Sequence, residues 1–160
     1  MVRLEDVEET FASILRNIEC PVFDTHPWIN GPPLNERRVA IISTAGLHRR
    51  DDSPFLVQSD SAQDWPADYR VIPSDTVAED LVMSHVSTNF DRTGFQQDLN
   101  LVFPIERLRE LLADGVIGSI AKYHYAFMGA TPPTVLEAVA KDLAAILKQD
   151  QVDGVVLAGV

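Results

Sequence analysis

Apolar residues recur along this chain with two spacings, one typical of helices and one typical of buried strands. Near the amino terminus the apolar positions recur every three or four residues: Leu4, Val7, Phe11, Ile14, Leu15 and Ile18. That spacing places them on one face of a helix. We expect the face to pack against the body of the protein or, if it is exposed, to form a contact between two copies in a homo-oligomer.

The segment after this helix predicts a connecting arm. Proline cannot continue a helix, so the helix is expected to end at Cys20-Pro21. Residues 21–36 carry four prolines and cannot hold regular structure for long. We expect Cys20 to be a small buried thiol. Phe23 and Trp28 are expected to pin the arm to the body through aromatic burial.

Continuous apolar runs predict buried strands in the rest of the chain. They occur at residues 38–44, 69–73, 81–85, 120–127 and 152–160. The first of these runs is apolar on both faces, as a central parallel strand requires. In the fourth run a histidine stands between two tyrosines, and we expect it to be a half-buried strand residue rather than a catalytic one.

Helices are predicted between the later strands. Residues 104–115 have proline in the first turn and glycine at the end, and a second helix begins near residue 132. The alternation predicts one α/β domain over residues 1–160, in which residues 1–36 form the N-terminal helix and a proline-rich arm. We expect a three-layer α/β/α sandwich with a mostly parallel, Rossmann-like sheet.

The ends of three predicted strands contain the candidate functional residues. Ligands of open α/β sheets lie beyond the carboxyl ends of the strands. The three ends are residues 43–46, 84–85 and 158–160. We expect them to converge on one pocket.

A histidine at one of these ends is followed by a long polar loop. His85 closes the run at 81–85, and Asp91 and Asp98 follow in the loop. An imidazole that carboxylates orient is suited to general acid/base catalysis or substrate binding. The same residues are also consistent with a structural polar network or, less well, with a divalent metal site, because their spacing matches no established metal motif.

A compact basic group follows the first predicted strand. His48, Arg49 and Arg50 are adjacent there, and they indicate either a binding site for an anion or carboxylate or a solvated turn. The predicted catalytic residues are His85, His48, Asp91 and Asp98. The predicted substrate-binding residues are Thr44, Gly46, Arg49, Ser84 and Asn100. The chain has neither GxGxxG nor GxxxxGK[ST], so we predict no nucleotide cofactor, and we predict no bound metal.

Composition excludes several classes of protein. The formal net charge of −11 argues against a nucleic-acid surface or an anionic membrane, since both need clustered Lys and Arg. No apolar run approaches the roughly 20 residues that span a bilayer, and the amino terminus is too acidic for a secretory signal. We therefore expect a cytoplasmic protein. A single cysteine excludes an intramolecular disulfide and every CxxC motif.

An ordered set of segments between about residues 38 and 160 resembles a known family. The segments are Ser84-His85-Val86-Ser87, Asp91-Arg92, 98–108, 115–118 and 125–129. Together they look like the selenoprotein B family of glycine, sarcosine, betaine and D-proline reductases. In that family the strand that resembles residues 155–160 is followed directly by selenocysteine or cysteine. The resemblance implies that this chain stops just before its redox residue, and that the 160-residue form is inactive.

The resemblance also implies a reaction and a partner. A selenolate attacks the carbon next to the amino group of an amino-acid-like substrate and breaks the carbon–nitrogen bond, with a second subunit that carries a pyruvoyl carbonyl. Cationic neighbours keep such a nucleophile anionic, and His48, Arg49 or His85 are candidates for this role. The chain is shorter than the glycine reductase subunit, and it has no recognisable site for forming a pyruvoyl group.

Two other kinds of protein remain consistent with the residues. One is a non-catalytic module whose polar loop binds a small carboxylate or a partner protein. The other is a hydrolase or lyase that uses His85 with Asp91 or Asp98, which is weaker because no nucleophile motif such as GxSxG is present.

Overall fold

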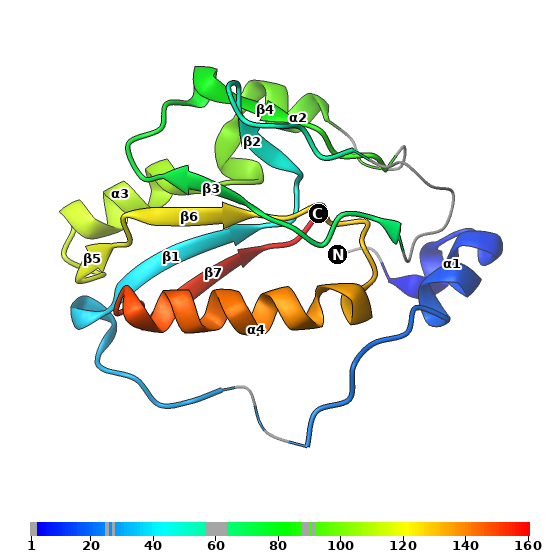
Figure 1. Cartoon of the computed structure of the whole chain (residues 1–160), viewed down its shortest axis with the longest axis horizontal. Helices are drawn as coiled ribbons and strands as arrows, with labels where there is room; N and C mark the ends of the chain where they lie inside the picture. The colour runs from blue at the N-terminus through cyan, green and yellow to red at the C-terminus, as the bar shows by residue number, and fades with distance from the viewer. Residues whose placement is uncertain (1–2, 25, 27, 57–63, 88–89, 91) are drawn as a thin grey trace.

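The computed structural model describes residues 3–24, 26, 28–56, 64–87, 90 and 92–160. Its α-helices are α1 (Glu9–Arg16), α2 (Thr93–Gln97), α3 (Ile105–Ala113) and α4 (Pro133–Gln149). Its strands are β1 (Arg38–Ser43), β2 (Leu47–Arg49), β3 (Arg70–Pro73), β4 (Leu81–Met83), β5 (Ser119–Ile120), β6 (Tyr123–Ala126) and β7 (Gly154–Ala158). Figure 1 shows how these elements are arranged.

Strand β1 is the centre of the main sheet. It pairs in parallel with β5 and β6 on one side and with β7 on the other, in the register Val39↔Gly154 to Ser43↔Ala158. Strand β3 runs antiparallel to β6, and β2 and β4 form a separate antiparallel pair. The α/β class is confirmed, with a mixed sheet. The three-layer Rossmann-like sandwich is not confirmed, because the predicted strand at 81–85 pairs with β2 outside the main sheet.

Both faces of β1 are covered by side chains from different elements. On one face Leu143 and Leu147 of α4 pack against Tyr125 and Phe127. On the other face Ile41 belongs to a cluster with residues of α3 and of the segment before it: Val102, Phe103, Ile105 and Leu108. Burial on both faces explains why the sequence of β1 is an uninterrupted apolar run.

The N-terminal segment differs from three predictions. The helix is shorter than predicted, and Ala12 is its only buried residue, so the stripe of Phe11, Ile14, Leu15 and Ile18 does not pack into a core. Cys20 is exposed. Phe23 and Trp28 are 65% and 81% exposed, so they do not pin the arm. Pro21 and Phe23 of the arm border a cavity whose other wall is α4.

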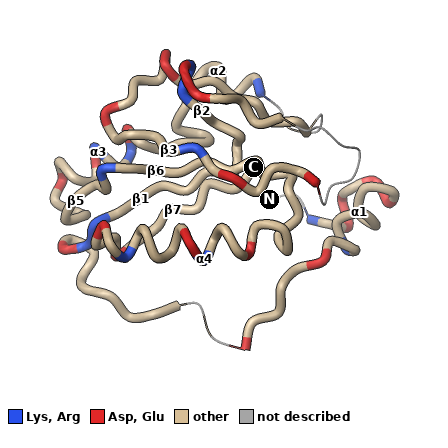
Figure 2. Tube along the Cα trace, in the orientation of Figure 1, with Lys and Arg blue, Asp and Glu red and all other residues tan. Residues whose placement is uncertain are grey.

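Charged residues lie mainly on helices and loops. Figure 2 shows that the middles of β1, β6 and β7 carry neither acidic nor basic residues. Among the described residues, no helix is both long enough and apolar enough to cross a bilayer.

Candidate functional site

The three predicted strand ends lie together at the carboxyl end of β1. The backbone N–H of Val160 donates to Thr44 Oγ1 over 3.0 Å, and the N–H of Thr44 donates to the carbonyl of Ala158 over 3.0 Å. The N–H of Ser84 donates to the carbonyl of Gly46 over 2.9 Å. The segment 44–46 therefore touches the end of β7 on one side and the end of β4 on the other.

Two glycines permit the close approach of these segments. Gly46 has a φ of +65°, and a Cβ there would lie 3.0 Å from the backbone nitrogen of His85. A Cβ on Gly129 would lie 2.5 Å from the carbonyl oxygen of Thr44, so a side chain has no room. Because both obstacles are backbone atoms, a side chain at either position would force the strand ends apart.

His85 is the buried titratable group of this site. It is 4% exposed, and its Nδ1 accepts a hydrogen bond from the N–H of Ser87 over 3.1 Å. The neutral ring therefore carries its proton on Nε2, which has no hydrogen-bond partner in the described part of the chain. Burial lowers the pKa of His85, and the charge of Arg92 lowers it further. The ring is accordingly neutral at pH 7, and its Nε2–H is a buried hydrogen-bond donor without an acceptor in the described part of the chain.

Two neighbours of His85 were not among the predicted site residues. The ring of Phe90 lies 5.1 Å from the ring of His85, and the guanidinium of Arg92 donates a hydrogen bond to the carbonyl of His85. Both belong to the polar loop after β4, which the sequence marked as chemically rich. Nothing in the spacing of that loop indicates which of its side chains turns back toward His85.

His48 has a different environment from the one predicted for a catalytic residue. Its Nδ1 lies 2.7 Å from the carbonyl of Arg49, and its Nε2 lies 2.7 Å from Ser84 Oγ. Since a carbonyl only accepts, Nδ1 carries the proton and Nε2 accepts from the Ser84 hydroxyl. The buried His48 thus joins β2 to the end of β4.

The basic group at 48–50 is divided among separate contacts. Arg49 forms an ion pair with Asp51 over 2.7 Å. Arg50 donates to the carbonyl of Glu79 over 2.8 Å. Each of the three side chains is engaged by a different part of the chain, and the predicted binding of an anion stays a prediction.

Asp98 and Asn100 hold the start of α3 in place. Asp98 Oδ1 accepts hydrogen bonds from the backbone and side-chain N–H groups of Asn100, each over 2.9 Å. These bonds lower the pKa of Asp98. Asn100 Oδ1 accepts from the N–H of Glu106 over 3.1 Å. Asp91, the other predicted carboxylate, lies outside the described residues, among which no group of three potential metal ligands is found.

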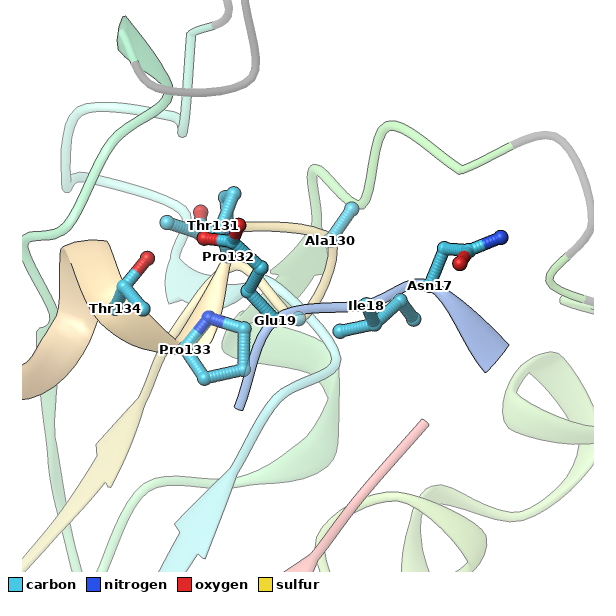
Figure 3. A pocket seen from close by; sticks show the side chains of 9 residues that line it. Asn17, Ile18, Glu19, Ala130, Thr131, Pro132, Pro133 and Thr134 are labelled. Carbon is cyan, nitrogen blue, oxygen red and sulfur yellow. The ribbon is translucent and has the colours of Figure 1, made fainter. Parts of the chain in front are cut away.

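Two open cavities lie near the carboxyl end of β1, and residues 84–85 and 158–160 are not among the described residues that line them. One of about 520 Å³ lies beside the turn that leads into α4, and Figure 3 shows Thr131, Pro132 and Pro133 on one side of it and Ile18 and Asn17 on the other. Gly129 belongs to its lining. A second, apolar cavity of about 290 Å³ lies between α4 and β7, and Thr44 belongs to its lining.

Comparison with known proteins identifies one family over nearly the whole chain. Residues 10–160 match the sequence model described as glycine/sarcosine/betaine reductase selenoprotein B. The D-proline reductase subunit gamma of Acetoanaerobium sticklandii is 31% identical over 126 residues, which cover 78% of this chain and 49% of that protein.

Two further relatives are named as subunits of related complexes. The betaine reductase complex component B subunit beta of Peptoclostridium acidaminophilum is 32% identical over 78% of this chain and 28% of its own length. The glycine reductase complex component B subunit gamma of Symbiobacterium thermophilum is 31% identical over 86% of this chain and 32% of its own length. The chain thus spans about half or less of the length of these relatives. No solved structure matches the chain.

Proposed function

Because the chain belongs to the glycine/sarcosine/betaine reductase selenoprotein B family, we propose that it is the part of a reductase subunit that presents a selenocysteine or cysteine directly after Val160. The carrying observation is the hydrogen bond from the N–H of Val160 to Thr44 Oγ1, because it directs the outgoing chain to the site where the strand ends meet. The carboxyl end of a parallel strand is the usual location of reactive groups in α/β proteins.

The proposed reaction is reductive cleavage of a carbon–nitrogen bond in a small amino-acid-like substrate. The selenolate or thiolate forms a bond to the carbon next to the amino group, and the electron pair of the carbon–nitrogen bond leaves with the amine, which takes up a proton. A dithiol then supplies two electrons and releases the carbon product. His85 is suited to bind the substrate by donating a hydrogen bond from Nε2–H, since its ring is neutral and its Nε2 has no partner among the described residues.

The positive charge of Arg92, beside His85, favours the anionic form of a selenol or thiol at this site. The guanidinium of Arg92 donates a hydrogen bond to the carbonyl of His85, and its charge lowers the pKa of the His85 ring. A positive neighbour favours the anionic form of a selenol or thiol. We therefore assign to Arg92 the charge-stabilising role for which the family resemblance had suggested His48, Arg49 or His85.

The proposal includes partner subunits and a cytoplasmic location. The named relatives are subunits of reductases or of reductase complexes. By analogy, the present chain acts with at least one further subunit.

The activity test uses the natural protein purified with its partner subunits. Glycine, sarcosine, betaine and D-proline are each supplied with a dithiol, and release of the amine, or opening of the D-proline ring, is measured. Activity on one of these substrates is expected, and it should disappear when the residue after Val160 is replaced by alanine. Undiminished activity in that variant, or a complex that binds these carboxylates without turnover, contradicts the proposal and favours a binding module.

A further inference from the structure

We propose that Thr44 is a positioning residue that fixes the direction in which the chain leaves β7, and thereby places the reactive residue after Val160. This role rests on the proposed function, and it differs from the substrate-binding role that the sequence suggests. The backbone of Thr44 continues the ladder with β7 by donating to the carbonyl of Ala158 over 3.0 Å. Its side chain then reaches beyond the strand and accepts from the N–H of Val160 over 3.0 Å.

The end of β7 has few other restraints. The paired strand stops at Ala158, and no atom of the described residues lies within 4 Å of the place where a Cβ would stand on Gly159. Val160 is exposed, and the carbonyl of Val160 lies 3.5 Å from Thr44 Oγ1. Glycine has more backbone freedom than any other residue. The direction of the chain after Gly159 is therefore set largely by the bond to Thr44.

Thr44 itself is held firmly. The carbonyl oxygen, Cβ and Oγ1 of Thr44 all lie within 3.0 Å of where a Cβ would stand on Gly129. On the preceding residue, Ser43 Oγ donates to the carbonyl of Val102 over 2.7 Å and accepts from the N–H of Ala45 over 3.2 Å. Both flanks of Thr44 are thus fixed, by the turn before α4 and by the segment before α3. A fixed hydroxyl can hold a reactive group within the small tolerance that catalysis allows.

Three variants separate the hydroxyl from the shape of this side chain. Thr44→Val keeps the branched shape and removes Oγ1. Thr44→Ser keeps an oxygen that can accept from Val160. Thr76→Val makes the same change in the turn after β3, far along the chain from β7, and serves as the matched control.

The first measurement does not depend on any redox residue. Hydrogen exchange of the Val160 amide is followed by NMR in the 160-residue chain. Loss of one hydrogen bond is expected to speed exchange about five- to tenfold in Thr44→Val, with little change in Thr44→Ser or Thr76→Val. Equal exchange rates in Thr44→Val and the unmodified chain overturn the proposal.

The second measurement adds a thiol where the reactive residue is proposed. A cysteine is appended after Val160 in the Cys20→Ser background, and its alkylation rate is followed against pH. The thiol pKa is expected to differ from the value of about 8.5 for free cysteine, to return toward it in Thr44→Val, and to be restored in Thr44→Ser. A thiol pKa that is the same in all variants means that Thr44 positions no reactive group, which also overturns the proposal.

The two measurements are independent of the activity test. If both give the expected results while the natural complex shows no reductase activity, the positioning role stands and the proposed reaction fails. If the complex is active but Thr44→Val changes neither measurement, the reaction stands and the positioning role fails.

Discussion

His85 is deeply buried, and one of its ring nitrogens has no hydrogen-bond partner in the described part of the chain. This arrangement costs folding free energy. Buried polar atoms normally have hydrogen-bond partners, yet His85 Nε2 has none in the described part of the chain. Its ring is held by Ser87 and lies against Phe90. A bound substrate that accepts a hydrogen bond from Nε2–H offsets this cost.

The charge of Arg92 makes a testable contribution to this titration. Burial is the larger cause of the lowered pKa of His85, and Arg92 is the second. In an NMR titration, we expect His85 to titrate below the ordinary histidine value of about 6.5. Arg92→Gln should raise the pKa of His85 part of the way back, because it removes the charge and leaves the burial. An unchanged midpoint in Arg92→Gln contradicts this account, and Arg107→Gln on α3 provides the control.

Gly129 is expected to be the least replaceable of the described glycines at the strand ends. Its missing Cβ would lie 2.5 Å from a backbone oxygen, which cannot move without displacing β1. Gly129→Ala should lower the free energy of unfolding by about 1–3 kcal/mol in urea titrations. Gly159→Ala should change it by less than about 0.5 kcal/mol, because the site is open. Equal effects of the two substitutions would show that the close approach at Thr44 is not tight.

The sequence predicted the positions of individual site residues better than their roles. Thr44, Gly46, Ser84 and His85 lie close together in the structure, because they follow strands that can be recognised from apolar runs and glycine, and their part in a functional site stays a prediction. The engagement of His48 by Ser84 could not be predicted, since it depends on β2 pairing with β4 rather than with the main sheet. Likewise, Asp98 and Asn100 form a local turn whose hydrogen bonds no spacing rule distinguishes from those of a catalytic pair.

At the scale of elements, a side chain replaces a missing backbone acceptor where β1 has no strand partner between β5 and β6. Strands β5 and β6 both run beside β1 and are separated by Ala121 and Lys122. At the gap, the N–H of Ile41 donates to Nδ1 of the fully buried His124 over 3.0 Å. His124, which was expected to be half-buried in a strand, is therefore fully buried. Its Nδ1 accepts the hydrogen bond that a backbone carbonyl would accept in a continuous strand.

This contact makes the stability of the sheet dependent on pH. Burial, and to a lesser degree the charge of Arg109, lowers the pKa of His124 to about 4. The unfolded chain has the ordinary value of about 6.5, so between these values the unfolded state binds more protons. The contribution is complete above about pH 6.5 and is lost as the pH falls to about 4, by on the order of 3 kcal/mol.

The test compares unfolding by urea at several pH values. His124→Asn keeps an acceptor near the position of Nδ1 but cannot take up a proton, so its stability should vary less between pH 6.5 and 4 than that of the unmodified chain. The exposed His26 provides the control, since His26→Gln should leave the pH dependence unchanged. A pH dependence that is the same in all three proteins contradicts the role of His124.

At the N-terminus, the spacing of apolar residues predicts the helix but not whether its apolar face is buried. An apolar stripe predicts a helix, and α1 is found, but the stripe alone does not say whether another element faces it. The exposed α1 face and the exposed Trp28 were predicted to be buried because aromatic and branched residues usually are. Whether a second copy covers the α1 face, as the sequence allowed, stays a prediction.

For the molecule as a whole, alternation of strands and helices was sufficient to predict an α/β domain centred on residues 38–44. It did not predict that β3 runs antiparallel, because the direction of an edge strand depends on the path of the long connection before it.

The whole-molecule account also explains why four segments far apart in sequence meet at one place. Strands β1, β6 and β7 are parallel, so their carboxyl ends lie at the same edge of the sheet. The pair β2–β4 then brings Ser84 and His85 to that edge through Gly46. The account therefore predicts that the reactive residue belongs directly after β7.

The most direct test of this central claim is mass spectrometry of the natural protein after digestion. We predict a peptide in which Val160 is followed by selenocysteine or cysteine, with selenium revealed by its isotope pattern. A natural protein that has Val160 as its carboxyl terminus, or any other residue after it, contradicts the claim that the strand ends present a redox residue.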